Sequence, residues 1–162
     1  MAASNERSWG GFAALILALL LSAHPLPEWL APFRPDWVAV TMIYLSIHTP
    51  RRLVLTQAFV VGLLLDALHG TPLGQYALAL LLCCYLPMKL HLRLMLVPVW
   101  QSMMSVALFT AIYQFVLFWC NGATGNAIGA GFYLWPILTN ALAWPIVLAL
   151  TDRLRLGPAP GN

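Results

Sequence analysis

Long uninterrupted apolar runs, separated by short polar breaks, dominate the pattern of this chain. Residues 12–21 are apolar at every position, and residues 94–151 include no Asp, Glu, Lys or Arg. One spanning helix needs about 20 apolar residues, so the second stretch is long enough for two spans and their connection. A membrane β-barrel would alternate apolar and polar positions with a period of two, and these runs do not. The pattern therefore predicts transmembrane helices.

Polar and Gly/Pro-rich breaks divide the apolar pattern into six helices. We expect an all-α, polytopic membrane domain over residues 1–156 and a disordered tail over residues 157–162. The expected helices cover residues 9–23, 37–49, 53–69, 75–88, 97–121 and 132–151, with a basic connection over residues 89–93. The second helix reaches only about 20 Å at 1.5 Å per residue, so it is either partly re-entrant or held in a locally thin region.

Composition indicates that lipid is the solvent of this chain. Of its 162 residues, 61% are hydrophobic and 8% are charged, whereas a soluble domain carries about 25% charged residues. The net charge of +3 is scattered in ones and twos, without the basic face that nucleic-acid binding requires. Cys83, Cys84 and Cys120 lie in apolar runs without metal-ligand or disulfide spacing, and we interpret them as small buried side chains.

The positive charges predict how the chain crosses the membrane, because Lys and Arg gather on the cytoplasmic side. With six spans and the N-terminus inside, all basic residues except Arg34 lie on the cytoplasmic side. A five-span arrangement without the short second helix would instead place Arg51 and Arg52 outside. We therefore expect six spans with both termini in the cytoplasm.

Two acidic residues are candidates for a site. Asp66 is the one acidic residue inside an expected span, where an Asp costs roughly 2.5 to 3.5 kcal/mol on insertion scales. Arg34 is the one basic residue on the outer side, so we expect it to pair with Asp66 and to hold the first loop against the third helix. An ion or proton site at Asp66 is the alternative, although the inner half of that helix offers only Thr56 and Gln57 as polar groups. Asp36 is expected to cap the second helix, which begins at Trp37.

Glycine, proline and asparagine mark further positions. Gly70 and Gly74 flank Pro72 and predict a turn, with close helix packing through their GxxxG spacing as the alternative. Asn140 is expected to hydrogen-bond across helices, and Pro145, next to Trp144, to bend the sixth helix. Such helix breaks can also build a substrate site in a transporter.

No catalytic triad, phosphate loop or carboxylate pair occurs in the sequence, and the four histidines lie at four different segment ends. A zinc site needs three or four convergent ligands. We therefore expect no metal, no cofactor and no enzymatic activity.

Several motifs, taken in order, resemble the rod shape-determining protein family MreD. They are Phe33-Arg34-Pro35-Asp36-Trp37, Leu65-Asp66 followed by Gly70, Leu73 and Gly74, Trp100-Gln101, and Asn140 with Trp144-Pro145. The order and spacing match along nearly the whole chain, as does a first helix that ends in Pro25-Leu26-Pro27. Ser102 departs from the pattern, because close relatives often continue there with a second Gln.

The resemblance implies a non-enzymatic scaffold of the rod, or elongation, complex in the bacterial inner membrane, which helps to regulate peptidoglycan synthesis and cell shape. Its expected direct partner is MreC, while RodA, a class-B penicillin-binding transpeptidase and MreB belong to the same complex, and lipids surround it. The structural or interaction candidates are Arg34, Asp36, Trp37, Asp66, Gly70, Gly74, Asn140, Trp144 and Pro145.

The resemblance also implies a fold similar to the six-helix substrate-binding subunits of vitamin transporters. The alternative function is therefore a small-molecule carrier or the substrate-binding subunit of a transporter. A carrier needs a pocket with convergent polar groups, whereas a scaffold needs a groove for a partner helix. The few polar side chains inside the expected spans favour the scaffold.

Overall fold

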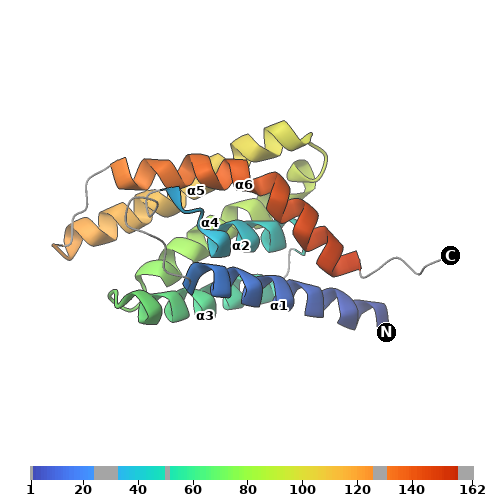
Figure 1. Ribbon diagram of the computed structural model, residues 1–162, viewed down its shortest axis with the longest axis horizontal. Coiled ribbons are helices and arrows are strands. Elements are labelled where there is room, and N and C mark those ends of the chain that lie inside the picture. The colour runs from blue at the N-terminus through green and yellow to red at the C-terminus, as the bar shows by residue number, and fades with distance from the viewer. Residues whose placement is uncertain (1, 24–32, 50–51, 126–130, 157–162) are drawn as a thin grey trace.

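The computed structural model describes residues 2–23, 33–49, 52–125 and 131–156. Within these residues six helices follow one another along the chain, as the sequence predicted. They are α1 (Ala2–Ala23), α2 (Trp37–His48), α3 (Arg52–His69), α4 (Gln75–Leu94), α5 (Val99–Ala123) and α6 (Gly131–Leu156). Figure 1 shows that α1 begins and α6 ends at the same end of the bundle.

Several helices extend further than the apolar pattern predicted. α4 does not end at Met88 but continues through Lys89, His91 and Arg93 to Leu94, so the expected basic connection over residues 89–93 is wrong. Likewise, α1 begins at Ala2 rather than at residue 9, and α6 continues past residue 151 to Leu156. The apolar pattern marks the part of a helix that lipid or protein covers, whereas hydrogen bonding continues beyond it, and basic side chains in a last turn favour the helix. The predicted tail over residues 157–162 and the Pro25-Leu26-Pro27 end of the first helix lie outside the described residues.

The short helix α2 lies at the centre of the bundle, where it packs against each of the other five helices. Every residue from 38 to 47 is buried. The helix has 12 residues and is therefore about 18 Å long, too short to cross a bilayer alone. Because the other helices surround it, α2 is a core element of the protein rather than a lipid-facing span.

Helices α3 and α4 form a tight antiparallel pair joined by a turn. Gly70 and Gly74 have φ angles of 64° and 103°, a left-handed conformation that glycine adopts without strain. A Cβ built on either glycine would meet nothing within 4 Å, so both serve the turn and not helix packing. Close packing occurs instead at Gly62, where an added Cβ would lie 2.3 Å from the Cα of Ala77.

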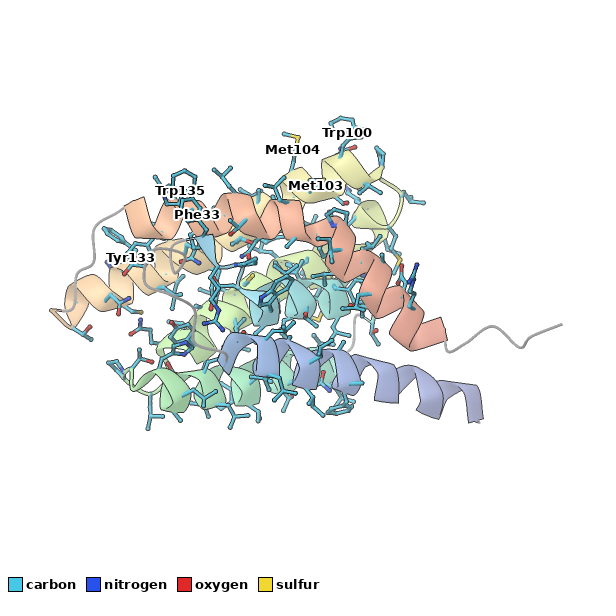
Figure 2. All side chains as sticks on the ribbon, viewed as in Figure 1. Phe33, Trp100, Met103, Met104, Tyr133 and Trp135 are labelled. Atoms are coloured by element: carbon cyan, nitrogen blue, oxygen red, sulfur yellow. The ribbon has the colours of Figure 1, made fainter. Side chains whose placement is uncertain are left out.

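In the part of the chain that the structure describes, three helical stretches are long and apolar enough to cross a membrane: α4, α5 and residues 133–153 of α6. The apolar stretches of α1, α2 and α3 are shorter. On α5, the exposed Trp100 and Trp119 are 19 residues apart, which corresponds to about 28 Å and is close to the thickness of a bilayer core. Figure 2 shows Trp100 and Trp135 near opposite ends of the face formed by α5 and α6, as expected for indole rings at the two membrane interfaces.

Candidate functional site

The segment that precedes α2 is fixed to the end of α1. The Arg34 guanidinium Nη2 donates a hydrogen bond to the carbonyl oxygen of Leu21 at 2.6 Å. Leu21 lies in the last turn of α1, where carbonyl groups have no partner within the helix, and a basic side chain is a suitable donor for them. In the same segment, the Phe33 ring packs 4.7 Å from the ring of Trp135 on α6.

Asp36 joins the beginning of α2 to α5 and α6. Its backbone N–H donates to Asn140 Oδ1 at 2.7 Å, and its carboxylate Oδ2 accepts a hydrogen bond from Gln114 Nε2 at 2.6 Å. Gln114 and Asn140 are both buried. Asp36 occupies the N-cap position as expected, but its carboxylate makes no capping hydrogen bond to α2. We call Asp36, Gln114 and Asn140 the Asp36 cluster.

The Asp36 cluster lies inside the bundle and not at its end. Gln114 precedes the last residue of α5 by nine positions, and Asn140 follows the first residue of α6 by nine positions. At 1.5 Å per residue, both lie about 13 Å along their helices from that end. The chain therefore reaches this depth before α2 begins, which is the reason why α2 is short.

Asp66 closes the turn between α3 and α4. Its Oδ2 accepts a hydrogen bond from the Gly74 N–H at 2.8 Å, and its Oδ1 accepts one from the Tyr76 N–H at 2.9 Å and one from the Thr71 hydroxyl at 3.0 Å. Two of these donors are amides at the start of α4 that have no partner within the helix. The side chain is fully buried.

The pairing of Arg34 with Asp66 that the sequence suggested is wrong. Arg34 binds the end of α1, whereas the Asp66 carboxylate is bound by three neutral donors from its own turn and the start of α4. A carboxylate that accepts several hydrogen bonds needs no cation beside it.

A second polar cluster lies where α2, α5 and α6 meet at the end that holds both termini. The Tyr44 hydroxyl donates to the Asp152 carboxylate, and the Trp144 indole N–H donates to the Ser102 hydroxyl at 2.9 Å. The rings of Tyr44 and Trp144 are 6.3 Å apart. Trp144 thus joins α6 to α5 and α2 through its buried ring and one hydrogen bond.

At the neighbouring Pro145 the helix lacks an N–H donor, and Figure 1 shows that the second half of α6 is bent relative to the first half.

Sequence reasoning missed Gln114, Tyr44 and Asp152 as partners within these clusters. Gln114 carried a signal, because an amide in the middle of an apolar helix needs a hydrogen-bond partner. Ser102, noted only for its departure from the family pattern, is the acceptor for Trp144. Trp37 lies at the first position of α2 and is half-buried.

The histidines in the described part of the chain bind their own helices. The Nδ1 atoms of His48, His69 and His91 each lie within hydrogen-bond distance of a backbone carbonyl three or four residues earlier. In the described residues, no group of three or more His, Cys, Asp and Glu side chains could hold a metal ion.

A groove of about 230 Å³ separates α1 from α3, two helices that both pack on α2. It is lined by Phe12, Leu15, Ile16 and Leu19 of α1 and by Thr56, Gln57, Val60 and Val61 of α3. Phe12, Ile16 and Val60 are each about half-exposed or more. This surface is open, apolar and marked by one amide side chain.

Comparison with known proteins identifies a family and a relative. A family model described as rod shape-determining protein MreD matches residues 8–154. A protein of Haemophilus influenzae named "Rod shape-determining protein MreD" is 26% identical over 144 residues, which cover 86% of each chain. No solved structure matches, so the expected likeness in fold to transporter subunits has no support from known structures.

Proposed function

The chain belongs to the MreD family of rod shape-determining proteins, and from that premise we propose that it is a non-enzymatic scaffold of the rod complex which binds MreC in the bacterial inner membrane. Through MreC it contributes to the regulation of peptidoglycan synthesis by RodA and its class-B transpeptidase partner, in an assembly organised by MreB. Family membership supports the role in rod shape, and the long apolar helices support the membrane location.

In the proposed topology all six helices cross the membrane region and both termini are cytoplasmic. Two independent features support this arrangement. The first is the distribution of positive charge, with Arg34 alone on the outer side. The second is the position of the start of α1 and the end of α6 at one end of the bundle, which requires an even number of crossings (Figure 1).

The observation that carries the proposal is the groove between α1 and α3. The described residues that line it all belong to helices α1 and α3, so its axis can continue along both helices, as the seat of a partner helix requires. Gln57 is half-buried at this surface. Lipid tails offer no hydrogen-bond partner to an amide, whereas a helix of MreC offers polar side chains and closely packed backbone. The groove thus fits a transmembrane helix better than lipid.

The interior favours a scaffold over a carrier. In the Asp36 cluster, Gln114 donates to the Asp36 carboxylate and Asn140 Oδ1 accepts from the N–H at the start of α2, while Asn140 Nδ2 has no partner among the described residues. A substrate-binding subunit would instead direct such groups into a pocket.

Co-purification with MreC in mild detergent tests the proposal. Val60→Trp fills the groove, and we expect about tenfold less MreC to co-purify, the factor that corresponds to roughly 1 to 2 kcal/mol of helix–helix interaction. Gln57→Leu should weaken the complex in the same direction. Leu108→Trp, at an exposed position of α5 outside the groove, is the matched control and should leave co-purification unchanged. Equal recovery of MreC with Val60→Trp and Leu108→Trp would show that MreC does not bind in the groove between α1 and α3.

A further inference from the structure

A second and larger groove lies on another face of the protein, beside the turn between α3 and α4. Its volume is about 530 Å³. One wall comes from Phe59 of α3, the floor from Leu78 and Leu81 of α4, and the other wall from Cys120 and Ala123 of α5. Pro72, Leu73 and Gly74 of the turn line it as well. Helix α4 therefore lies between two apolar walls, with a loop at one end of the groove.

The turn distinguishes this groove from the one between α1 and α3. A membrane-spanning helix has to continue past the end of the bundle, and here the loop over residues 72–74 belongs to the lining. A flexible chain that enters from the bilayer and stops at the interface meets no such obstacle. Most of the lining is apolar, and Leu73 and Leu78 are exposed. These features fit an acyl chain whose headgroup lies at the turn.

Gln75 supplies a polar group at the headgroup end. It is the first residue of α4, it is 95% buried, and it lines the groove. Its Nε2 donates to Asn121 Oδ1 at 2.8 Å, but its Oε1 has no hydrogen-bond partner among the described residues. An amide oxygen is an acceptor, so the missing partner is a donor. Neighbouring atoms shield this oxygen in the structure, so the Gln75 side chain has to turn toward the groove before a ligand can donate to it. The hydrogen bond then gained removes the cost of a buried acceptor without a donor.

The charge of the groove narrows the ligand class. None of the described residues that line it is charged, so they offer no counter-ion for a phosphate. A phospholipid that binds here therefore has to be zwitterionic, with a positive charge of its own that balances the phosphate. Among zwitterionic lipids, Gln75 Oε1 favours a headgroup that has N–H donors. We propose that this groove binds phosphatidylethanolamine, with an acyl chain on α4 between Phe59 and Cys120 and the ammonium group at Gln75. Phosphatidylcholine has no N–H donor, and phosphatidylglycerol has no positive charge.

Native mass spectrometry of the full-length protein tests this site. The protein is delipidated in detergent, incubated separately with phosphatidylethanolamine, phosphatidylcholine or phosphatidylglycerol of identical acyl chains, and scored for retained lipid. We expect about fivefold more bound phosphatidylethanolamine than either other lipid, which is the factor expected of one hydrogen bond. Equal retention of the three lipids would overturn the proposal.

Two variants localise the binding. Leu78→Trp fills the groove from an exposed position of α4 and should abolish the preference for phosphatidylethanolamine. Leu142→Trp, at an exposed position of α6 outside the groove, should retain it. Thermal unfolding in detergent without added lipid establishes that both variants are folded. A preference that survives Leu78→Trp would place the lipid elsewhere and contradict the proposal. Neither result depends on MreC binding, because the α1–α3 groove is unchanged in both variants.

Discussion

At the scale of single residues, the two acidic side chains near the α1–α2 connection and the α3–α4 turn are held by neutral donors. Asp66 accepts three hydrogen bonds and Asp36 accepts one from Gln114, while Arg34 binds a carbonyl group. Hydrogen bonds to a carboxylate are stronger than those between neutral groups and offset part of the cost of its burial. These acids therefore determine how the chain turns and where α4 and α2 begin.

Substitution of Asp66 should destabilise the fold independently of Arg34. Asp66→Ala leaves the N–H groups of Gly74 and Tyr76 without acceptors, at about 1 to 3 kcal/mol each, so we expect a loss of roughly 2 to 5 kcal/mol. Arg34→Ala removes one exposed hydrogen bond and should cost less than about 1 kcal/mol. Unfolding by SDS titration in mixed micelles measures both values.

The double variant separates this account from an ion pair. Two residues without a shared contact have effects that add within about 0.5 kcal/mol, so Arg34→Ala combined with Asp66→Ala should equal the sum of the single losses. Exchanging the charges, Arg34→Asp with Asp66→Arg, should not restore stability. A double variant that is clearly more stable than the sum would show that the two side chains do interact.

The sequence draws attention to several residues of this site but does not reveal their contacts. Asp36, Asp66 and Asn140 stood out because polar groups are rare in apolar helices and because family motifs contain them. Their partners could not be deduced in the same way. Asp36 and Asn140 are 104 positions apart, and Asp36 and Gln114 are 78 apart, so no local periodicity connects them. The pairing of Asp66 with Arg34 by charge sign failed because two backbone amides and a hydroxyl, which carry no charge, supply the hydrogen bonds to Asp66.

At the scale of helices, the tight pair α3 and α4 rests on one small residue. A Cβ at Gly62 would lie 2.3 Å from the Cα and 2.6 Å from the backbone N of Ala77. Both atoms belong to the backbone, so no change of rotamer can relieve the contact. Close approach of this kind allows dispersion contacts along two helices for which lipid provides no hydrophobic driving force.

Gly62→Ala should therefore push α3 away from α4. We expect a loss of about 1 to 3 kcal/mol, typical of overpacking, measured as a lower thermal-unfolding midpoint in detergent. Adding Ala77→Gly should not rescue it, because the backbone atoms of residue 77 remain in place. Gly122→Ala is the matched control: a Cβ there meets nothing within 4 Å inside α5, so stability should be unchanged or raised by up to about 1 kcal/mol. Full rescue by Ala77→Gly would show that the side chain of Ala77, and not the backbone, sets the distance.

The number and order of helices followed from the apolar pattern, but their lengths and packing did not. Apolar runs show where lipid or protein covers a helix, so they wrongly predict a connection at the basic end of α4 beyond Met88. The sequence also does not predict that α2 lies at the centre of the bundle, because a buried helix and a lipid-facing helix are both apolar. What sets α2 apart is burial on every side, and burial depends on how the other five helices surround it.

At the scale of the whole molecule, α3 lies between the two open grooves. Its Thr56, Gln57 and Val60 line the groove shared with α1, and its Phe59 lines the groove shared with α4 and α5. Occupants of the two grooves would thus contact neighbouring sides of one peripheral helix. The rest of the bundle is tied together through α2, so α3 is the helix on which a partner and a lipid would act with least disturbance of the core.

The proposed orientation of the molecule can be tested at three exposed positions. In a background with Cys83, Cys84 and Cys120 replaced by Ala, single cysteines are introduced at Leu96, Thr124 or Arg153, each exposed in the structure. Leu96 lies between α4 and α5 and Arg153 near the end of α6, whereas Thr124 follows α5 at the opposite end of the bundle. In the proposed orientation, which the positive charges favour, the first two positions lie in the cytoplasm and Thr124 lies outside.

A membrane-impermeant maleimide applied to cells with a permeabilised outer envelope should therefore label Thr124→Cys and leave Leu96→Cys and Arg153→Cys unlabelled. Disruption of the inner membrane should make all three reactive, which controls for accessibility. The proposed orientation rests on the distribution of charge, and the antiparallel order of α4, α5 and α6 determines which helix ends lie together. The proposal therefore requires the three positions to alternate between the two sides of the membrane. Labelling of Leu96→Cys in place of Thr124→Cys would mean an inverted molecule. Labelling of Thr124→Cys and Arg153→Cys together would mean that α6 does not cross, and the scaffold would then have to present its α1–α3 groove in a different membrane setting.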